Sequence, residues 1–403
     1  MQLSRIWRNF LTLSAGETVA RLLHAMAFFV IARRAGTETF GEFGLAMTIA
    51  LYVSLLVQQG FDTVGVRAGA KDPSSMKQMA ARILALRIAS GLAVAFLLIT
   101  YTVARNWSVS FKITLVLLSF GAMIRQLSPR WVLLAIETTY PIALANIIAQ
   151  LAVLISALLV TKPEDLIWVG AGQLTGELLC CAYIFRRVQP YVGWPSISWD
   201  GAAIWRESLP LTYTVIVGAL LFSFDVLAMD WLHRPMSEIG LYNAVYRCVN
   251  IFSMLLGSLQ ISILPLFARA YPDRSKGIKL AWRATRLSVP AGVALAVIFT
   301  VFGRQILTLL YGPSYGEGTW LLAYLTWVMP LAALRGVLRP CLIAFQLQHV
   351  DAVNMSVALA VNVVFDFLLI PEYGPMGCVI ATILSEITLT LLSAVAVRGI
   401  KNA

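Results

Sequence analysis

The sequence predicts an all-α, polytopic membrane protein, and three observations lead to this fold class. The chain of 403 residues is 59% hydrophobic and only 13% charged, and its mean hydropathy of +0.79 is far above that of a soluble domain. Apolar stretches of about 20 residues, enough to cross the hydrocarbon layer as a helix, recur from Leu11 to the residues before Arg398. Continuous apolar runs at 151–160 and 291–301 favour helices over the short alternating strands of a β-barrel.

Glycines, prolines and clusters of charge divide the apolar stretches into about twelve spans. They are expected near residues 11–32, 43–66, 80–103, 111–136, 142–160, 166–187, 209–231, 240–267, 287–310, 319–346, 351–370 and 376–397. The longest polar connection, 188–207, is rich in Pro, Gly, Ser and Trp and falls at the middle of the chain. We therefore expect an N-terminal six-helix bundle over 1–187, a cytoplasmic linker over 188–207 and a C-terminal six-helix bundle over 208–403.

The first apolar stretch resembles a signal peptide only superficially. It contains Glu17, Arg21 and His24 and continues to Ala32, which makes it too long and too polar for the apolar core of a signal peptide. The five cysteines all fall inside apolar segments and show no metal-ligand spacing, so we predict small buried side chains and no metal site.

The distribution of positive charge predicts the topology. With the N-terminus inside, 17 of the 31 Lys and Arg fall in inside loops, 7 in outside loops and 7 within helices. Because positive charge marks the cytoplasmic side, both termini are expected to be cytoplasmic in a multi-pass protein of the cytoplasmic membrane. The net charge of +11 is thus explained by topology and by contact with lipid headgroups, and it does not indicate nucleic-acid binding.

The two halves of the chain resemble each other. Matching segments occur in the same order at an offset of about 200 residues: 7–11 with 205–209, 39–43 with 238–242, 124–127 with 334–337, and Glu177 with Glu386. This order predicts a parallel repeat of six plus six helices, related by an axis along the membrane normal.

Three longer segments carry a resemblance to a known family. They are 30–52 (VIARRAGTETFGEFGLAMTIALY), 225–246 (DVLAMDWLHRPMSEIGLYNAVY) and 309–386, which contains LLYGPSYGEG, Asn362-x-x-x-Asp366 and Gly374-x-x-Gly377. Over nearly its whole length the chain resembles the Wzx-type O-antigen flippases, in the polysaccharide-transport branch of the multidrug/oligosaccharidyl-lipid/polysaccharide (MOP) superfamily. That family often has Asn where Asp366 stands.

The resemblance implies a MATE-like pair of six-helix bundles around a central cavity, alternating between inward-open and outward-open states. It also implies an undecaprenyl-diphosphate-linked oligosaccharide as substrate, for O-antigen or exopolysaccharide assembly. A polysaccharide polymerase and a chain-length regulator are the expected protein partners, beside membrane lipids. No cofactor is expected, apart from coupling to H⁺ or Na⁺.

Charged and polar side chains within the spans are the candidate site residues, because such groups cost about 2.5 to 3.5 kcal/mol at bilayer depth unless they are compensated. Glu17, Arg21 and His24 share one helical face, and a second polar face contains Asn243, Tyr246, Arg247 and Asn250. A diphosphate suits arginine, which stays protonated and binds phosphate oxygens bidentately. The candidate substrate-binding residues are Arg21, His24, Arg125, Arg247, Asn250, Arg335 and Arg339.

Two other roles remain open for the intramembrane charges. The arginines can instead reach out to headgroups, or pair with Glu17 or Glu177 to hold helices together. The candidate ion-coupling residues are Glu17, Asp62, Asp225 and Asp366, since a buried carboxylate can bind and release a proton. For Glu177 and Glu386, whose positions match in the two halves, a structural role is favoured.

Rival functions predict different side chains. An enzyme needs an acid/base or metal constellation, whereas His24, His233 and His349 are scattered, and no P-loop, HExxH or DxD-type pair occurs; we expect no catalytic residues. The closer alternative is a multidrug/cation antiporter of the same superfamily, which predicts an acidic cavity with few basic groups. Seven intramembrane arginines favour an anionic substrate instead.

Overall fold

The computed structural model describes residues 2–270 and 273–400, and the side chains among these except for residues 2–11, 251–262, 264–265 and 274. The described chain is helical throughout and divides into two compact units, residues 1–216 and 217–403. The boundary falls within a single helix, α8 (Ala202–Trp231). Each unit is described by itself.

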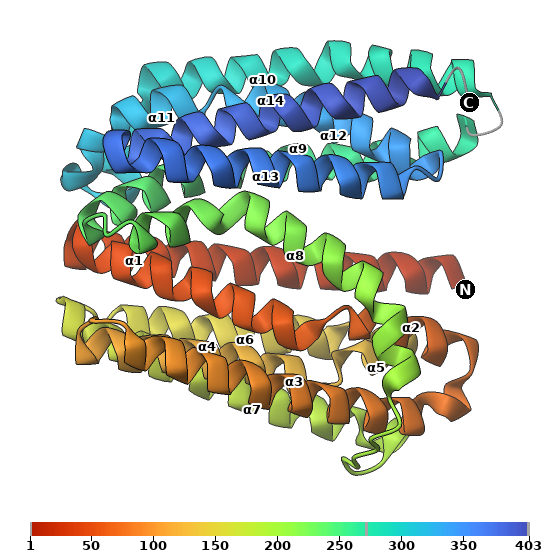
Figure 1. Ribbon diagram of the computed structural model, residues 1–403. Helices are drawn as coiled ribbons and strands as arrows, with labels where there is room; N and C mark the ends of the chain where they lie inside the picture. The colour runs from red at the N-terminus through yellow and green to blue at the C-terminus, as the bar shows by residue number, and fades with distance from the viewer. Residues whose placement is uncertain (1, 271–272, 401–403) are drawn as a thin grey trace. The chain divides into compact units, whose positions relative to one another are not determined.

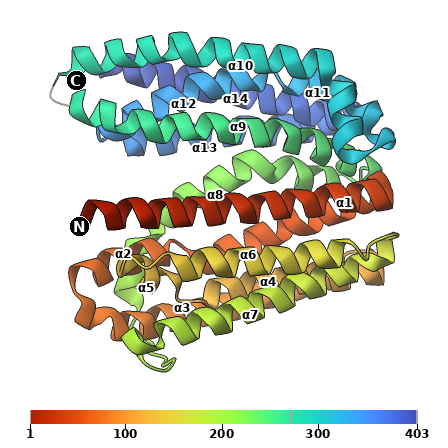
Figure 2. The same ribbon diagram turned by 180° about the vertical axis from the view of Figure 1, so that it is seen from behind.

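Unit 1 contains seven α-helices and the first half of α8. They are α1 (Gln2–Gln58), α2 (Phe61–Lys71), α3 (Met76–Ala104), α4 (Val109–Leu127), α5 (Arg130–Ala135), α6 (Tyr140–Ala157) and α7 (Leu166–Val192). The long helices run alongside one another, with α4 and α6 packed on α7 (Figures 1 and 2). A buried apolar cluster around Trp131, Val132 and Ile184 joins them.

Helix α1 turns back on itself at Gly36 (Figure 1). Gly36 has φ 80° and ψ −176°, a left-handed backbone that glycine adopts without the steric penalty of a side chain. The stretch Thr12–Lys71 is 60 residues long, or about 90 Å as a helix, so a reversal allows it to cross a membrane twice. This agrees with the two spans expected on either side of residues 33–42.

Unit 2 contains the second half of α8 and six further α-helices. They are α9 (Met236–Ala270), α10 (Arg274–Tyr311), α11 (Thr319–Leu325), α12 (Val328–Ala344), α13 (Gln348–Tyr373) and α14 (Pro375–Gly399). Helix α13 packs along α14, and α12 contacts α9, α10 and α14. The turn between α13 and α14 uses Gly374 (φ 55°) followed by Pro375 at the first position of the new helix.

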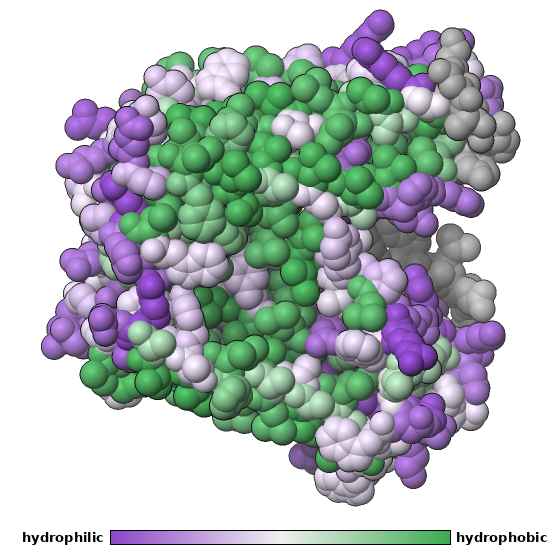
Figure 3. All heavy atoms as spheres, in the orientation of Figure 1, coloured by the Kyte–Doolittle hydropathy of each residue, from purple (hydrophilic) through white to green (hydrophobic). Residues whose placement is uncertain are grey.

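The fold is that of a multi-pass membrane protein. Among the described residues, nine helical stretches are long and apolar enough to cross a membrane, or ten if α11 and α12, bent by 48°, form one span. The sequence predicts about twelve spans because it counts Thr12–Lys71 as two and also counts α9. The structure does not describe all side chains of α9. Hydrophobic side chains cover the middle of the helices and hydrophilic ones gather at their ends (Figure 3).

The polar connection at the middle of the chain is shorter than the expected linker. Residues 188–192 continue α7 and residues 202–207 belong to α8, which leaves 193–201 irregular. This segment is held on α3: the Ser198 amide donates to the Ala81 carbonyl at 3.2 Å, and the Arg82 guanidinium pairs with Asp200 at 2.7 Å. The connection is therefore anchored at two points to unit 1.

Candidate functional site

Unit 1 contains a polar cavity of about 260 Å³ between α1, α4 and α6. Its lining residues are Glu17, Ala20, Arg21, His24, Arg125, Asn146 and Gln150. The three α1 side chains that the sequence places on one helical face thus all line the same cavity, which also contains the predicted Arg125.

The α1 side chains are only loosely held. Arg21 Nη2 lies 3.3 Å from Glu17 Oε2, and the Arg21 side chain is 62% exposed. Exposed pairs of this kind contribute less than about 1 kcal/mol. His24 Nδ1 lies 2.8 Å from Gln150 Oε1, which orients the imidazole on the cavity wall. Arg21 can therefore exchange its partner for a ligand at low cost.

Two arginines converge on one buried carboxylate beside this cavity. Arg125 Nη1 donates to Glu177 Oε1 at 3.0 Å and Arg130 Nη2 pairs with Glu177 Oε2 at 3.5 Å, while Arg130 Nη1 donates to Asn146 Oδ1 at 2.6 Å. Glu177 is fully buried, whereas Arg125 is 35% exposed. Two guanidinium groups facing one carboxylate leave an excess positive charge, and Arg125 presents it to the cavity.

Unit 2 contains a cavity of about 310 Å³. Its lining residues are Leu221, Phe222, Tyr246, Val249, Asn250, Leu325, Val328, Ala332, Arg335, Thr382, Ser385 and Glu386. Arg335 forms a bidentate pair with Glu386, with Nε and Nη2 each 3.2 Å from a carboxylate oxygen. Its guanidinium carbon also lies 5.3 Å from the centre of the Phe222 ring, a cation–π geometry.

The two buried ion pairs correspond to each other in sequence. Arg125 matches Arg335 and Glu177 matches Glu386, and in each unit the matched Arg pairs with the matched Glu. The first pair joins α4 to α7 and the second joins α12 to α14. The matched positions were visible in the sequence, but the pairing of Arg335 with Glu386 was not. The units differ in that Glu386 faces one arginine where Glu177 faces two.

A cluster of buried polar groups centres on Asp225 of α8, in unit 2. Its carboxylate accepts hydrogen bonds from the Tyr242 hydroxyl, from Asn362 Nδ2 at 3.2 Å and from the Thr382 hydroxyl at 3.1 Å. These donors come from α9, α13 and α14, so one carboxylate ties four helices together. Thr382 also lines the unit 2 cavity, which connects the cluster to it.

Asp366 lies against this cluster without a donor of its own. It is fully buried, its carboxyl group interacts with that of Asp225, and neither of its oxygens has a hydrogen-bond donor among the described residues. The Asn362 side-chain oxygen is also buried and unsatisfied. Three acceptor oxygens therefore remain unfilled beside a second carboxylate, an arrangement that suits a proton or an oxygen-liganded cation.

The remaining predicted residues lie elsewhere. Arg339 pairs with Asp351 at 3.0 Å. Arg247 of α9 is half-buried and is not among the residues that line the unit 2 cavity, although Asn250 of the same helix is. Asp62 pairs with the buried Arg87 at 2.7 Å, which favours a structural role for this carboxylate.

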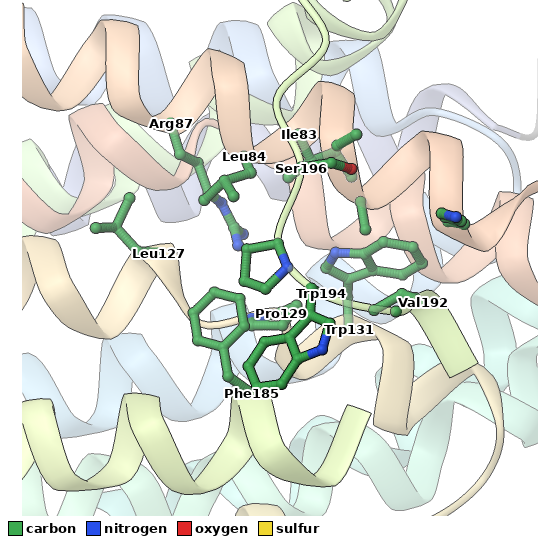
Figure 4. A pocket seen from close by; sticks show the side chains of 15 residues that line it. Ile83, Leu84, Arg87, Leu127, Pro129, Trp131, Phe185, Val192, Trp194 and Ser196 are labelled. Carbon is green, nitrogen blue, oxygen red and sulfur yellow. The ribbon is translucent and has the colours of Figure 1, made fainter. Parts of the chain in front are cut away.

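Arg87 also borders a small cavity of about 20 Å³. Figure 4 shows the side chains of Arg87, Leu127, Pro129 and Phe185 around it. The space is sufficient for one water molecule and too small for a sugar. It is separate from the two larger cavities, because it shares no lining residue with them.

Several contributing residues were not predicted from the sequence. They are Asn146, Gln150, Phe222, Tyr242 and Thr382. For the Asp225 cluster, the sequence indicated the intramembrane carboxylates Asp225 and Asp366 and the position of Asn362 on the same helical face as Asp366. It did not indicate the donors Tyr242 and Thr382. Neutral side chains such as Gln150 are common at helix surfaces, and only the neighbouring helix reveals what they contact.

Among the described residues, no group of three or more His, Cys, Asp or Glu is arranged to hold a metal ion. The five cysteines are buried, as their apolar surroundings predicted. The candidate site is thus composed of arginines, carboxylates and neutral polar groups.

The family comparison identifies relatives in polysaccharide assembly. A family model described as "Polysaccharide biosynthesis protein" matches residues 6–271. The "Putative O-antigen transporter" of Escherichia coli (strain K12) is 22% identical over 407 aligned residues, covering 98% of this chain and 97% of that protein. The "Capsular polysaccharide biosynthesis protein CapF" of Staphylococcus aureus is 24% identical over 182 residues, 44% of this chain and 46% of that protein. For CapF the chain thus matches about half the length of the relative.

Solved structures show the same fold. An inward-facing MATE family multidrug resistance transporter of the MOP superfamily aligns with a TM-score of 0.76 at 14% identity, covering 94% of this chain and 95% of that one. The lipid II flippase MurJ, in an inward closed conformation, aligns with a TM-score of 0.75 at 13% identity, covering 96% and 87%. At such identities the similarity establishes the architecture, and the MATE-like fold expected from the sequence is confirmed.

Proposed function

We propose, from the premise that this chain belongs to the polysaccharide biosynthesis protein family, that it is a flippase for a lipid-linked oligosaccharide. The chain is a multi-pass membrane transporter of polysaccharide biosynthesis and not an enzyme. The proposed substrate is an undecaprenyl-diphosphate-linked oligosaccharide, moved across the cytoplasmic membrane by alternating access for O-antigen or exopolysaccharide assembly. Both termini are placed in the cytoplasm by this proposal, because Lys and Arg concentrate in the loops on that side.

The observation that carries the proposal is the excess positive charge beside the unit 1 cavity. Arg125 and Arg130 share the single carboxylate of Glu177, so one guanidinium charge is available to an anionic ligand. Arg125 is exposed enough to be reached, and its remaining N–H groups can bind phosphate oxygens bidentately. Two guanidinium groups held by one buried acid are better suited to a diphosphate than to an organic cation.

The other lining residues supply neutral and cationic contacts. Arg21 is only weakly paired and serves as a second phosphate ligand in this proposal. His24, Gln150 and, in unit 2, Asn250 and Tyr246 offer donors and acceptors that suit sugar hydroxyls. Arg335 is more tightly bound to Glu386, and it serves as the cationic group of the unit 2 cavity.

We assign ion coupling to Asp225 and Asp366. Within the described part of the chain these two adjacent buried carboxylates have no cationic partner, and they repel each other strongly in a medium of low dielectric. Binding of H⁺ or Na⁺ between them is therefore favourable. Glu17 and Asp62, in contrast, each have an arginine partner. Thr382 contacts Asp225 and is one helical turn from Glu386, so ion binding can affect the unit 2 cavity through α14.

The stacking of Tyr242 on Tyr246 provides a second connection. The ring centres are 5.8 Å apart; Tyr242 donates to Asp225 and Tyr246 lines the cavity. A change in the charge of the Asp225 cluster therefore reaches the cavity through two helices.

A polymerase and a chain-length regulator are proposed as partners on the receiving side of the membrane.

Deletion of the gene tests this proposal directly. A flippase-deficient strain should accumulate a lipid-linked oligosaccharide on the cytoplasmic face and lose the corresponding surface polymer, and mass spectrometry of extracted lipids identifies the glycan. The wild-type gene should restore export and Arg125→Ala should not. Arg186→Ala, at an exposed position of α7 away from both cavities, is the matched control and should restore it. Unchanged lipid-linked glycans, together with new sensitivity to cationic drugs, would instead identify an antiporter.

A further inference from the structure

A second charged site lies in unit 2, where α9 ends and α10 begins. A groove of about 480 Å³ separates these two helix ends. Arg269 and Leu266 of α9 line one side, and Lys276, Lys279 and Arg283 of α10 line the other. Neither the cavities described above nor the proposed transport cycle involves these residues.

The groove has a large uncompensated positive charge. Asp273 is its one acid, and that carboxylate accepts a hydrogen bond from the Lys276 backbone amide at 2.9 Å to cap α10. Within the part of the chain that the structure describes, none of the four cations forms an ion pair with a carboxylate. All four side chains are exposed, so their N–H groups are available to a ligand.

The cations converge on the groove because of their spacing. Lys276, Lys279 and Arg283 are separated by three and four residues, which places them on one face of α10. Arg269 projects from the last turn of α9 toward the same groove. A ligand with several acceptor oxygens can thus contact cations from two helices at once, unlike a ligand on an ordinary solvated helix face.

The groove lies at the depth of lipid headgroups. Helix α10 has 38 residues and is about 57 Å long, whereas the hydrocarbon layer is about 30 Å thick. Its N-terminal charged stretch ends at Arg286, and residues 287–303 contain no charged side chain, so residues 274–286 lie outside the hydrocarbon. Trp282, whose ring lies 5.5 Å from the Arg398 guanidinium carbon, is typical of the membrane–water interface.

We propose that this groove binds the phosphate headgroup of an anionic membrane phospholipid. The phosphate oxygens accept hydrogen bonds from Arg269, Lys276, Lys279 and Arg283, and the apolar side chains of Leu266 and Leu280 contact the first carbons of the lipid tails. The occupant is a membrane lipid and not a soluble anion, because the groove combines apolar lining with interfacial depth. Its binding anchors the C-terminal end of α9 and the N-terminal part of α10 at the membrane surface.

The test compares two double variants of the full-length protein in detergent micelles. Lys276→Ala with Lys279→Ala removes two cations from the groove. Arg67→Ala with Lys71→Ala is the matched control. It removes two exposed cations from α2, which do not line the groove. Binding of phosphatidylglycerol and of neutral phosphatidylcholine is measured by native mass spectrometry, and a monodisperse elution profile establishes that each variant is folded.

Wild-type protein should retain phosphatidylglycerol in preference to phosphatidylcholine. At about a five-fold effect per cation, the groove variant should bind phosphatidylglycerol about twenty-five-fold more weakly, while the control variant stays within about three-fold of wild type. Equal weakening in both variants would show that binding depends only on general surface charge and would overturn the proposal. Displacement of the lipid by millimolar inorganic phosphate or pyrophosphate would also overturn it, since the site would then belong to a soluble anion.

Discussion

Glu177 and Arg125 form one ion pair but are expected to respond differently to substitution. Glu177→Ala removes the one carboxylate that, among the described residues, pairs with Arg125 and Arg130. Since loss of one partner from a buried pair leaves an uncompensated charge, the variant should lose about 3–5 kcal/mol of stability. The fully buried position of Glu177 leaves little access for water to compensate.

Arg125→Ala should be much less destabilising. After this change Glu177 keeps the Arg130 pair at 3.5 Å and the hydrogen bond from Gln173 Nε2 to Oε1 at 3.3 Å. Arg125 itself is 35% exposed, so the expected cost is about 1–2 kcal/mol. Export should nevertheless be abolished, because the guanidinium that faces the cavity is gone.

The assay combines thermal unfolding of the purified variants in detergent with restoration of surface polymer in the deletion strain. We expect Glu177→Ala to unfold at a clearly lower temperature than Arg125→Ala, while Arg125→Ala retains near-wild-type abundance in the membrane and exports nothing. Arg125→Lys preserves the charge but not the bidentate geometry, and should restore export partly. Equal destabilisation by both alanine variants, or full export by Arg125→Ala, would refute the assignment of Arg125 to substrate.

Three further predictions follow from individual contacts. Asp366→Asn should not lower the unfolding temperature in detergent, because the carboxylate accepts no hydrogen bond from a described donor and its repulsion of Asp225 is removed. The variant should abolish the dependence of export on an imposed ion gradient in membrane vesicles; a retained dependence would exclude Asp366 from coupling. Arg335→Lys should lower stability by about 1–3 kcal/mol through loss of the bidentate pair, measured by thermal unfolding against wild type. Gly36→Ala should cost about 1–2 kcal/mol of stability because Gly36 has a φ of 80°, although there is space for the added Cβ. Gly65→Ala should cost more, because its Cβ would lie 2.6 Å from the Trp131 ring; equal unfolding temperatures for the two variants would contradict this ranking.

The helices themselves were largely predictable, because a membrane span is a local property. A run of apolar side chains must satisfy its backbone hydrogen bonds internally, so composition over about 20 residues predicts a helix. The reversal at Gly36 followed from charge and glycine in residues 33–42. The nine-residue length of the irregular middle segment, 193–201, was not predictable, since Pro190 is accommodated inside the end of α7.

The buried charges were also visible in the sequence, whereas their partners were not. An arginine within an apolar run signals a compensating group, but several acids are equally distant along the chain. Arg335 pairs with Glu386 across 51 residues, and Arg87 with Asp62 across 25. The choice between a binding role and a structural role therefore required the positions of neighbouring helices.

By itself the sequence determined that this protein is an all-helical, multi-pass membrane protein with charges inside its spans, and that its halves share matched Arg and Glu positions. Each of these properties depends on residues within one helix or on a comparison of two segments. Only the tertiary structure decided that Arg125 and Arg130 share Glu177. It also decided that Asp225 collects donors from three other helices, while Asp366 has no donor among the residues that the structure describes. The physical reason is that compensation of a buried charge acts over a few ångströms in space, between residues such as Asp225 and Thr382 that are 157 positions apart in the chain.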